Sequence, residues 1–313
     1  MTTSTGLDTP GTQVEGCLDD ARLVRSVRSQ VGRFSMEDVE QYLGGAKLYG
    51  DDFDRKQLEE WYEDERNGYA HLVVSKERPK GYTSHLKNLR YGYRFLPRKK
   101  YANVLGFGGA DGSEFLPILP LLGEIVIIEP TEAFVRSRIG NVPLTYVKPS
   151  MDGLLPFGDN TFDLATSFGA LHHVANVSQV VKELARCLRP GGFLLIEEPT
   201  VSMGDWRKPR EGLTKRERGI PLNIFRRIVQ RAGLEIIRER RILFSATGKL
   251  GGLLHVPLWT FEVPLFVDEI LCRLFYWNTR YHPRNLVEWL MPTNVFYVLR
   301  KPHEGLRHLS DLN

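Results

Sequence analysis

One short apolar run that ends in glycines constrains the fold of this chain more than any other feature. Residues 103–109 read Asn-Val-Leu-Gly-Phe-Gly-Gly, which is the pattern of a buried parallel strand followed by a tight turn. Apolar runs recur at 124–128, 162–168 and 193–196, and residues 177–188 place their apolar side chains on one helical face. Strands that alternate with helices predict an α/β fold with a doubly wound, mostly parallel sheet.

The last third of the chain predicts two more strands with an insertion between them. Residues 221–232 have the pattern of a helix, and strands are predicted at 234–243 and 294–299. Residues 245–291 lie between these two strands, which is too long a stretch for a simple connection inside a compact domain. We therefore expect a Rossmann-like, seven-stranded sheet with a lid inserted before its last strand.

The region before residue 101 is predicted to be mainly helical. Ser35 followed by Asp38 resembles a helix-capping signal, and residues 51–66 carry apolar side chains at helical spacing. The chain is expected to begin with a tail (1–17) and a helical extension (18–100). The Rossmann-like core (101–244), the lid (245–291), the last core strand (292–302) and a second tail (303–313) are expected to follow.

Composition narrows the class of protein further. The chain has 42 basic and 38 acidic side chains, a small difference that requires no polyanionic partner. Its cysteines, Cys17, Cys187 and Cys272, are far apart and have no metal-binding spacing, so no metal site is predicted. The first residues lack the apolar stretch of a secretory signal, and the longest apolar region, 253–267, is interrupted by prolines and polar residues. A cytoplasmic protein without a transmembrane segment is the resulting expectation.

The glycine loop and the acid after the next strand predict a cofactor site. Gly106, Gly108 and Gly112 have the spacing GxGxxxG, whereas the dinucleotide fingerprint is GxGxxG, so a nicotinamide or flavin cofactor is disfavoured. Glu129 ends the strand predicted at 124–128, where a doubly wound fold offers an acid to ribose hydroxyls. The alternatives are a plain strand-to-helix turn at the glycines and a solvated loop acid at Glu129.

Three sequence blocks follow the glycine loop. They are Leu-Pro-Phe-Gly-Asp-Asn-Thr-Phe-Asp-Leu at 155–164, Ala-Leu-His-His-Val at 170–174 and Leu-Arg-Pro-Gly-Gly at 188–192. In this order they resemble the class I S-adenosylmethionine-dependent methyltransferases of the UbiE-like (methyltransferase type 11) family, over about residues 104–199. The resemblance implies the Rossmann-like fold and S-adenosylmethionine as the cofactor.

The resemblance also implies which residues hold the cofactor. They form the loop under its amino acid part, the acid on ribose, an adenine contact and a position on the fourth strand: Gly106, Gly108, Gly109, Ala110, Gly112, Glu129, Asp152 and Ser167. The chain departs from the family pattern in the loop, where Gly106 replaces a common acid and Ala110 replaces a glycine. Met151 occupies the position of the usual acid before the Leu-Pro-Phe block, which leaves Asp152 as the implied adenine contact.

Methyl transfer from a sulfonium needs few catalytic side chains, because the cofactor already carries the reactive group. The protein has to align the acceptor and, for some acceptors, remove a proton. His172 and His173 follow the fourth predicted strand at the edge where such folds bind ligands, so either of them, His173 first, is a candidate general base. Glu198, at the end of the fifth strand, is a further candidate for a base or substrate anchor. The alternative for all three is a structural duty.

The lid is expected to supply the acceptor contacts, because its aromatic side chains can stack on sugars, ring systems or acyl chains. A helix at 262–277 would have one apolar face suited to a membrane interface, although Asp268 and Glu269 oppose that interpretation. We expect methyl transfer to a hydroxyl of a small-molecule, glycan or glycolipid acceptor. The sequence makes no prediction of oligomeric state.

Two alternative functions stay open. Basic stretches at 94–100, 207–218 and 238–241 would suit an RNA methyltransferase. Against this, residues 167–170 read Ser-Phe-Gly-Ala where the resembling amino-methylating families carry Asp/Asn-Pro-Pro-Tyr/Phe, so a nucleic-acid partner is disfavoured. The unusual glycine loop would suit a catalytically silent, methyltransferase-like binding module.

Overall fold

The computed structural model describes residues 35–74 and 81–303. The chain divides into two compact units, Met1–Glu40 and Gln41–Asn313. In the first unit, the described residues contain the start of helix α2 (Met36–Leu43). The hydroxyl of Ser35 accepts the backbone N–H of Asp38 at 3.0 Å and donates to the Asp38 carboxylate at 2.8 Å. The predicted cap at Ser35 is therefore confirmed.

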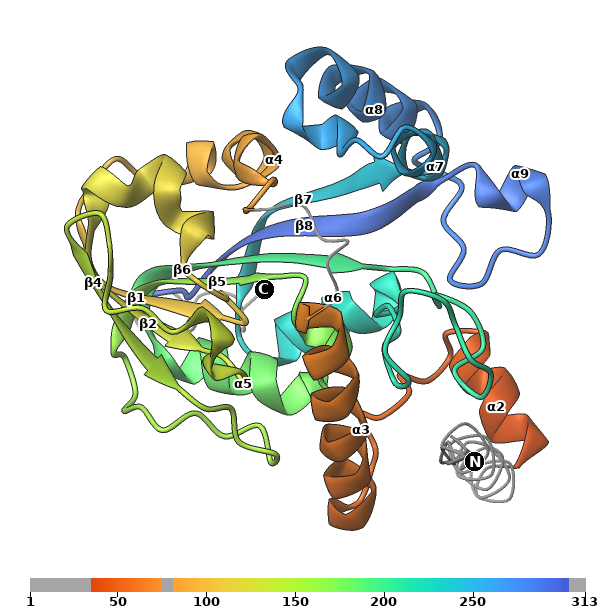
Figure 1. Cartoon of the computed structure of the whole chain (residues 1–313), viewed down its shortest axis with the longest axis horizontal. Helices are drawn as coiled ribbons and strands as arrows, with labels where there is room; N and C mark the ends of the chain where they lie inside the picture. The colour runs from red at the N-terminus through yellow and green to blue at the C-terminus, as the bar shows by residue number, and fades with distance from the viewer. Residues whose placement is uncertain (1–34, 75–80, 304–313) are drawn as a thin grey trace, which may run out of the picture. The chain divides into compact units, whose positions relative to one another are not determined.

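In the described part of the second unit, eight strands form one sheet (Figure 1). They are β1 (Tyr101–Phe107), β2 (Leu122–Ile128), β3 (Arg138–Ile139), β4 (Val142–Val147), β5 (Phe162–Phe168), β6 (Leu188–Pro199), β7 (Glu235–Phe244) and β8 (Pro292–Arg300). Their spatial order is β3-β4-β2-β1-β5-β6-β8-β7. Strands β4, β2, β1, β5 and β6 are parallel, and β8 runs antiparallel to both β6 and β7. The Rossmann-like, mostly parallel fold is confirmed.

The prediction of seven strands was one short. Six of the seven had been given residue ranges, and neither β3 nor β4 was among them. Strand β3 pairs antiparallel with β4 through only two residue pairs. A tight turn at Gly140, whose φ is +55°, returns the chain from β3 to β4, a conformation that glycine adopts without steric cost. A two-residue strand leaves no periodic signal in the sequence, so pattern alone could not find it.

Helices connect the strands and cover the sheet. The α-helices after α2 are α3 (Arg55–Val74), α4 (His85–Tyr91), α5 (Val177–Cys187), α6 (Leu222–Arg231), α7 (Ser245–Leu253), α8 (Glu262–Leu274) and α9 (Leu286–Trp289). Short 3-10 helices are η1 (Tyr93–Phe95), η2 (Ser113–Leu121), η3 (Glu132–Phe134), η4 (Leu171–His173) and η5 (Leu258–Thr260). The connection from β1 to β2 is 3-10 because Pro117 and Pro120 interrupt an α-helical hydrogen-bond ladder.

The Pro-Gly-Gly segment at 190–192 lies inside strand β6, because helix α5 already ends at Cys187. Gly191 has a φ of +78°, and the segment pairs with Lys301, the residue after β8. Gly191 N–H donates to the Lys301 carbonyl at 2.7 Å, and Lys301 N–H donates to the Gly192 carbonyl at 2.9 Å.

Apolar side chains bury both faces of the sheet. One face packs against α5 and α6 through Leu105, Ala165, Leu194 and Tyr297 among others. The other face packs against α4, η2 and α8 and includes Val104, Leu164, Leu195 and Val298. Alternate residues of each central strand thus enter opposite cores, as expected for a sheet covered on both sides.

The chain crosses from one half of the sheet to the other between β1 and β5. After β1 it builds β2, β3 and β4 on one side, and then returns to pair β5 with the free side of β1. Open α/β sheets bind ligands at such a switch point, beyond the carboxyl ends of the strands. The loops after β1, β2 and β5 therefore meet where a ligand is expected.

Residues 245–291 leave and re-enter the sheet at neighbouring points. Phe244, the last residue of β7, pairs with Pro292, the first of β8, and Ser245 N–H donates to the Met291 carbonyl at 3.0 Å. Helices α7, α8 and α9 lie between these points, and α8 packs against β7 (Figure 1). None of the helices in the described ranges has the length and apolarity that crossing a bilayer requires.

Candidate cofactor and acceptor site

A cavity of about 410 Å³ lies beyond the carboxyl ends of β1, β2 and β5. The loops after these strands, helix α3 and the segment between β6 and α6 contribute its walls. The lining residues used below are Tyr62, Glu65, Gly108, Ala110, Glu129, Phe168, His172, His173 and Glu217. Its volume falls in the range of small-molecule and cofactor sites, roughly 300–1,000 Å³.

The glycine loop after β1 has an unusual backbone. Gly108, Ala110 and Gly112 all have positive φ, at +68°, +45° and +75°. A Cβ atom on Gly108 would lie 2.4 Å from the Cβ of Ala170, so only glycine lets the loops after β1 and β5 come together here. Ala110 holds a left-handed conformation at a small steric cost, which explains how alanine replaces the family's glycine.

The acid that the family commonly carries at the first loop position has no room in this protein. A Cβ atom on Gly106 would lie 2.8 Å from the side chain of Ile127 and 3.2 Å from the ring of Phe115. Both neighbours are fully buried. Gly106 therefore shapes the loop from inside strand β1, and it does not line the cavity.

Glu129 is the acidic group in the cavity wall after β2. It is 3% exposed, and its carboxylate accepts the backbone N–H groups of Ala110 at 3.2 Å and Thr131 at 3.5 Å. Burial outweighs these two bonds and raises its pKa from 4.5 to about 7. Glu129 is thus held at the glycine loop, where its carboxylate can accept ligand hydroxyls.

The structure brings together only part of the predicted cofactor set. Gly108, Ala110 and Glu129 line the cavity, whereas Gly106, Gly109, Gly112, Asp152 and Ser167 lie outside its lining. The Asp152 carboxylate is exposed and accepts bonds within its own loop, from the Ser150 hydroxyl at 2.5 Å and Leu154 N–H at 3.0 Å. The Ser167 hydroxyl is buried in β5 and has no hydrogen-bond partner among the described residues.

Glu114, a residue that the sequence did not single out, lies under the glycine loop. Its carboxyl group is buried and 2.5 Å from the hydroxyl of Thr166 on β5. Burial raises its pKa from 4.5 to about 7. Since its folded pKa exceeds its unfolded value, the carboxyl is neutral in the folded state up to about pH 7.

This pKa predicts a pH-dependent stability with a defined sign. Between about pH 4.5 and 7 the folded state binds the proton of Glu114 more tightly than the unfolded state, so the free energy of unfolding falls as pH rises, and levels off above pH 7. Glu114→Gln removes this loss, and we expect it to be more stable than the wild type by about 3 kcal/mol at pH 8 but similar at pH 4.5. Urea unfolding at both pH values measures the difference. Glu124→Gln, at an exposed position of β2, is the control, and an equal effect of Glu114→Gln at both pH values would contradict the assignment.

The two histidines of the predicted catalytic set both line the cavity, and Glu198 lies beneath them. Glu198 is fully buried. Its carboxylate accepts the backbone N–H groups of Ala170 at 2.9 Å, Leu171 at 2.6 Å and His172 at 3.2 Å. It also contacts Nδ1 of His172 at 2.7 Å. With these four contacts, Glu198 orients the turn that carries the histidines.

His172 lies between two carboxylates. Besides the Glu198 contact, its Nε2 atom is 3.4 Å from Oε1 of Glu217. Burial alone would lower the pKa of His172, but the charges and hydrogen bonds of Glu198 and Glu217 outweigh it and raise the pKa to about 10. Burial would raise the pKa of Glu217, but its contacts with the histidines lower it to about 2. His172 therefore forms a buried ion pair with the carboxylates of Glu198 and Glu217.

Helix α3 orients His173 from the other side. Nδ1 of His173 is 2.8 Å from Oε2 of Glu65, and Trp61 donates its indole N–H to the His173 carbonyl at 2.7 Å. Glu65 is fixed in turn by Thr214, whose hydroxyl donates at 2.7 Å, and by Arg216 N–H at 3.0 Å. The sequence predicted a helical region around Trp61, but not the contacts of Trp61 and Glu65 with a residue more than a hundred positions later.

A buried arginine holds the whole histidine loop. Arg218 is 1% exposed and stacks on Trp61, with its guanidinium carbon 5.2 Å from the ring centroid. It donates to five backbone carbonyls at 2.8 to 3.3 Å, those of Tyr49, Leu171, His172, Val174 and Ala175. These bonds tie the loop after β5 to the segment before α3.

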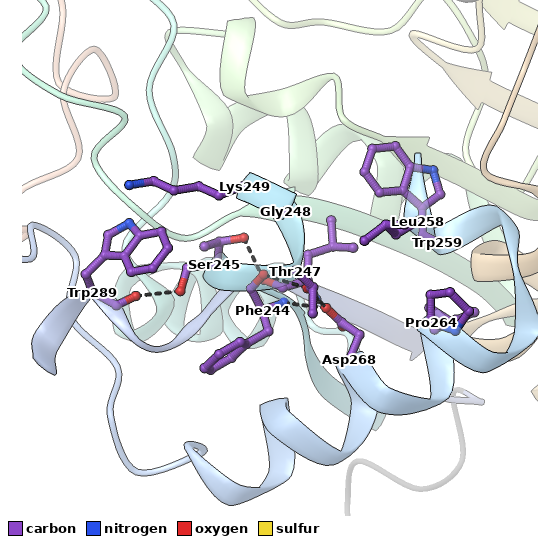
Figure 2. A pocket seen from close by; sticks show the side chains of 13 residues that line it. Phe244, Ser245, Thr247, Gly248, Lys249, Leu258, Trp259, Pro264, Asp268 and Trp289 are labelled. Carbon is purple, nitrogen blue, oxygen red and sulfur yellow. Dashed lines mark hydrogen bonds between the residues drawn. The ribbon is translucent and has the colours of Figure 1, made fainter. Parts of the chain in front are cut away.

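A second, smaller cavity of about 240 Å³ lies at the base of the lid (Figure 2). Its buried acid, Asp268 of α8, accepts the N–H groups of Leu243 at 3.2 Å and Phe244 at 2.8 Å, and the hydroxyl of Thr247. Asp268 thus attaches the lid to the end of β7. The carboxylate of Asp268 therefore faces the sheet and not the solvent.

A family model described as "Methyltransferase domain" matches residues 105–196, the span from the start of the glycine loop through β6. The chain carries a UbiE-like class I methyltransferase domain. The cofactor that this domain implies is S-adenosylmethionine, as the sequence blocks predicted.

The curated relatives share the methyltransferase domain only. The "Ubiquinone/menaquinone biosynthesis C-methyltransferase UbiE" of Idiomarina loihiensis is 30% identical over 128 residues, which cover 38% of this chain and 47% of that protein. The protein of the same name from Hydrogenovibrio crunogenus is 34% identical over 107 residues, 30% of this chain and 41% of that protein. The chain thus spans about half, or less, of the length of these relatives.

Among solved structures, an S-adenosylmethionine-dependent methyltransferase from Mesorhizobium loti is similar, with a TM-score of 0.46 and 17% identity, covering 70% of this chain and 98% of that one. The [4+2]-cyclase SpnF has a TM-score of 0.47 and 16% identity, covering 79% and 96%.

The residues present fit S-adenosylmethionine. The cavity has a suitable volume, and Glu129 offers an acceptor for ribose hydroxyls. Gly108 and Ala110 of the glycine loop line the same cavity as Glu129. Asp152, exposed and engaged in its own loop, does not contribute to this fit.

Proposed function

We propose that this protein transfers a methyl group from S-adenosylmethionine to a small-molecule acceptor that carries a hydroxyl group. The observation that supports this most directly is a single cavity that joins the glycine loop and Glu129 to the His172–His173 pair. The cofactor end and the acceptor end of the reaction thus share one enclosed space, beyond the strand ends at the switch point.

The chain's own residues would act by binding and alignment. When bound, the cofactor supplies an electrophilic methyl group on a sulfonium. Glu129 holds ribose, and the loop around Gly108 lets the two strand-end loops close on the ligand. The acceptor lies against His172 and His173, which Glu198 and Glu65 keep in fixed orientations. Such positioning is worth several kcal/mol in a displacement, because reacting atoms must meet in line. The prediction that a histidine removes the acceptor proton stays a prediction.

The exposed side chains of the lid support an acceptor with an apolar portion. Apolar residues of α7, α8, α9 and the connection between α8 and α9 are exposed, and the most exposed include Leu253, Val263, Leu274, Trp277, Leu286 and Val287. Patches of this kind mark sites that contact proteins, lipids or amphiphiles. A glycolipid or similar amphiphile at a membrane surface is the acceptor class that this surface favours.

The names of the relatives favour a second acceptor chemistry, transfer to a ring carbon. The UbiE proteins are named as C-methyltransferases of quinone biosynthesis, and a phenolic ring carries a hydroxyl as well as a reactive carbon. The match lies mainly within the cofactor-binding half, whereas the lid that would contact the acceptor is outside the family span. We therefore place an oxygen acceptor first and a phenolic carbon second.

The test is methyl transfer itself. The full chain is incubated with S-adenosylmethionine labelled in its methyl group and with a cell extract separated into lipid, small-molecule and nucleic-acid fractions, with and without lipid vesicles. We expect label in the lipid or small-molecule fraction, formation of an equal amount of S-adenosylhomocysteine, and co-sedimentation of the protein with vesicles. Mass spectrometry and NMR of the product then distinguish O-methyl from C-methyl.

Other outcomes of this experiment favour the rival functions. Label in the nucleic-acid fraction would identify an RNA methyltransferase. Binding of S-adenosylmethionine without transfer to any fraction would indicate a silent binding module and overturn the proposal.

A further inference from the structure

We propose that His172, His173 and Glu217 bind a divalent transition-metal ion of the zinc class at the acceptor end of the cavity. All three side chains line this cavity. One ligand atom from each lies within 4.8 Å of the other two. Two imidazole nitrogens and one carboxylate oxygen are a ligand set that such ions take in proteins, with positions left for water or substrate.

The spacing of the ligand atoms suits this ion. Two atoms bound at about 2.1 Å to a tetrahedral metal lie about 3.4 Å apart. The Nε2 atom of His172 and Oε1 of Glu217 are 3.4 Å apart. The rings of His172 and His173 have centroids 4.2 Å apart and an interplanar angle of 39°, so both imidazoles belong to the same small volume. The three ligand atoms lie within 4.8 Å of one another, so the widest pair has to approach by up to about 1.4 Å to surround one tetrahedral ion.

The contacts behind the histidines carry the inference further. Nδ1 of His172 is held by Glu198 at 2.7 Å, and Nδ1 of His173 is held by Glu65 at 2.8 Å. Metal-binding histidines nearly always donate one ring N–H to a carboxylate or carbonyl, which leaves the other nitrogen as the ligand atom. Here one nitrogen of each ring, Nδ1, is held by a carboxylate in this way. Glu217 is itself oriented by Thr214, whose N–H donates at 3.0 Å.

The charges around the cluster favour a divalent cation. Three carboxylates, those of Glu65, Glu198 and Glu217, contact two imidazoles, and each of the three is at most 9% exposed at its side chain. Arg210 and Arg218 lie near these carboxylates, but their guanidinium groups donate to backbone carbonyls and not to the carboxylates.

An ion at this place would add chemistry to the proposed function, on which this one step rests. It would bind an oxygen of the acceptor and lower the pKa of an acceptor hydroxyl, which prepares that oxygen for methylation without a histidine base. Metal binding itself does not depend on methyl transfer and is tested separately.

The experiment is a titration of the tag-free, full-length, chelator-treated protein with Co²⁺, followed by its visible absorption, and then displacement by Zn²⁺. We expect one equivalent of Co²⁺ to bind with intense bands of four- or five-coordinate cobalt. His173→Ala and Glu217→Gln should each weaken the affinity at least about 10-fold. His255→Ala and Glu211→Gln, which change the same residue types at exposed positions, are matched controls and should bind as the wild type does.

A measurement on the wild type keeps the test decisive if a variant fails to fold. In ¹⁵N-histidine NMR spectra, stoichiometric Zn²⁺ should shift the Nε2 resonances of His172 and His173 and leave those of His255 unchanged. Absence of stoichiometric binding, or shifts confined to other histidines, would overturn the metal site and leave the cluster as an ion pair only. Methyl transfer by the metal-free protein would still support the proposed function, so the two proposals fail independently.

Discussion

Arg218→Met is expected to lower the free energy of unfolding by about 3–5 kcal/mol. The guanidinium donates to five buried carbonyls, four of them in the loop that carries His172 and His173. Methionine fills a similar volume but donates nothing, so these carbonyls lose their partners in a place that water reaches poorly. Because the loop lines the cavity, cofactor affinity should also fall at least about 10-fold. Urea unfolding and calorimetry with S-adenosylmethionine measure the two effects.

The control for this change is Arg227→Met, which alters an exposed arginine of helix α6. Exposed substitutions of this kind change stability by no more than about 0.5 kcal/mol. If Arg218→Met and Arg227→Met had the same small effect, the carbonyl contacts of Arg218 would not be what holds the histidine loop.

Glu129→Ala is expected to weaken the binding of S-adenosylmethionine by about 100-fold while leaving the fold intact. A carboxylate that accepts two ribose hydroxyls makes two charge-assisted bonds, each worth about 1.5–3 kcal/mol. The fold should tolerate the change, because the raised pKa shows that burial of this carboxylate costs stability. Calorimetry at pH 8 measures the affinity, and circular dichroism checks the fold.

Glu132→Ala provides the matched control. It removes an exposed glutamate three residues away, which pairs with Lys148 at the surface, and should not change cofactor affinity. The wild type carries a second signature: its affinity should decrease as the pH falls below about 7, because Glu129 becomes protonated. Affinity of Glu129→Ala within a factor of three of the wild type would refute the role on ribose.

The sequence predicted most of the core because its strands are buried on both faces. Strand β5 was placed at its observed bounds, and the predicted α5, α6, β7 and β8 differ from the observed ones by one or two residues at most ends. In these elements the spacing of apolar residues over several positions fits either a helix or a strand, but not both. The start of β6 pairs with Lys301, more than a hundred residues later, and β3 has only two residues. Neither feature leaves a pattern in the local sequence.

The site was also predicted in part. Gly108, Ala110 and Glu129 line the cavity, and the sequence singled them out because they lie in short loops directly after predicted strands. The sequence analysis did not single out the residues that orient the histidines, Glu65, Glu217 and Arg218. Charged residues on helices and loops are usually at the surface, and only the fold shows that these three are buried. Glu198 was singled out for a chemical duty, which stays a prediction; its observed contacts are with the backbone of the turn and with Nδ1 of His172.

The pairing of Phe244 with Pro292 has a consequence for how such a chain can diversify. The two ends of residues 245–291 are already adjacent in the sheet, so replacing everything between them requires no new loop closure and leaves each strand in register. Residues 245–291 can therefore differ between related proteins while the strands that carry the cofactor site stay the same. Exchanging this segment between homologues is a way to change which acceptor is bound without redesigning the sheet.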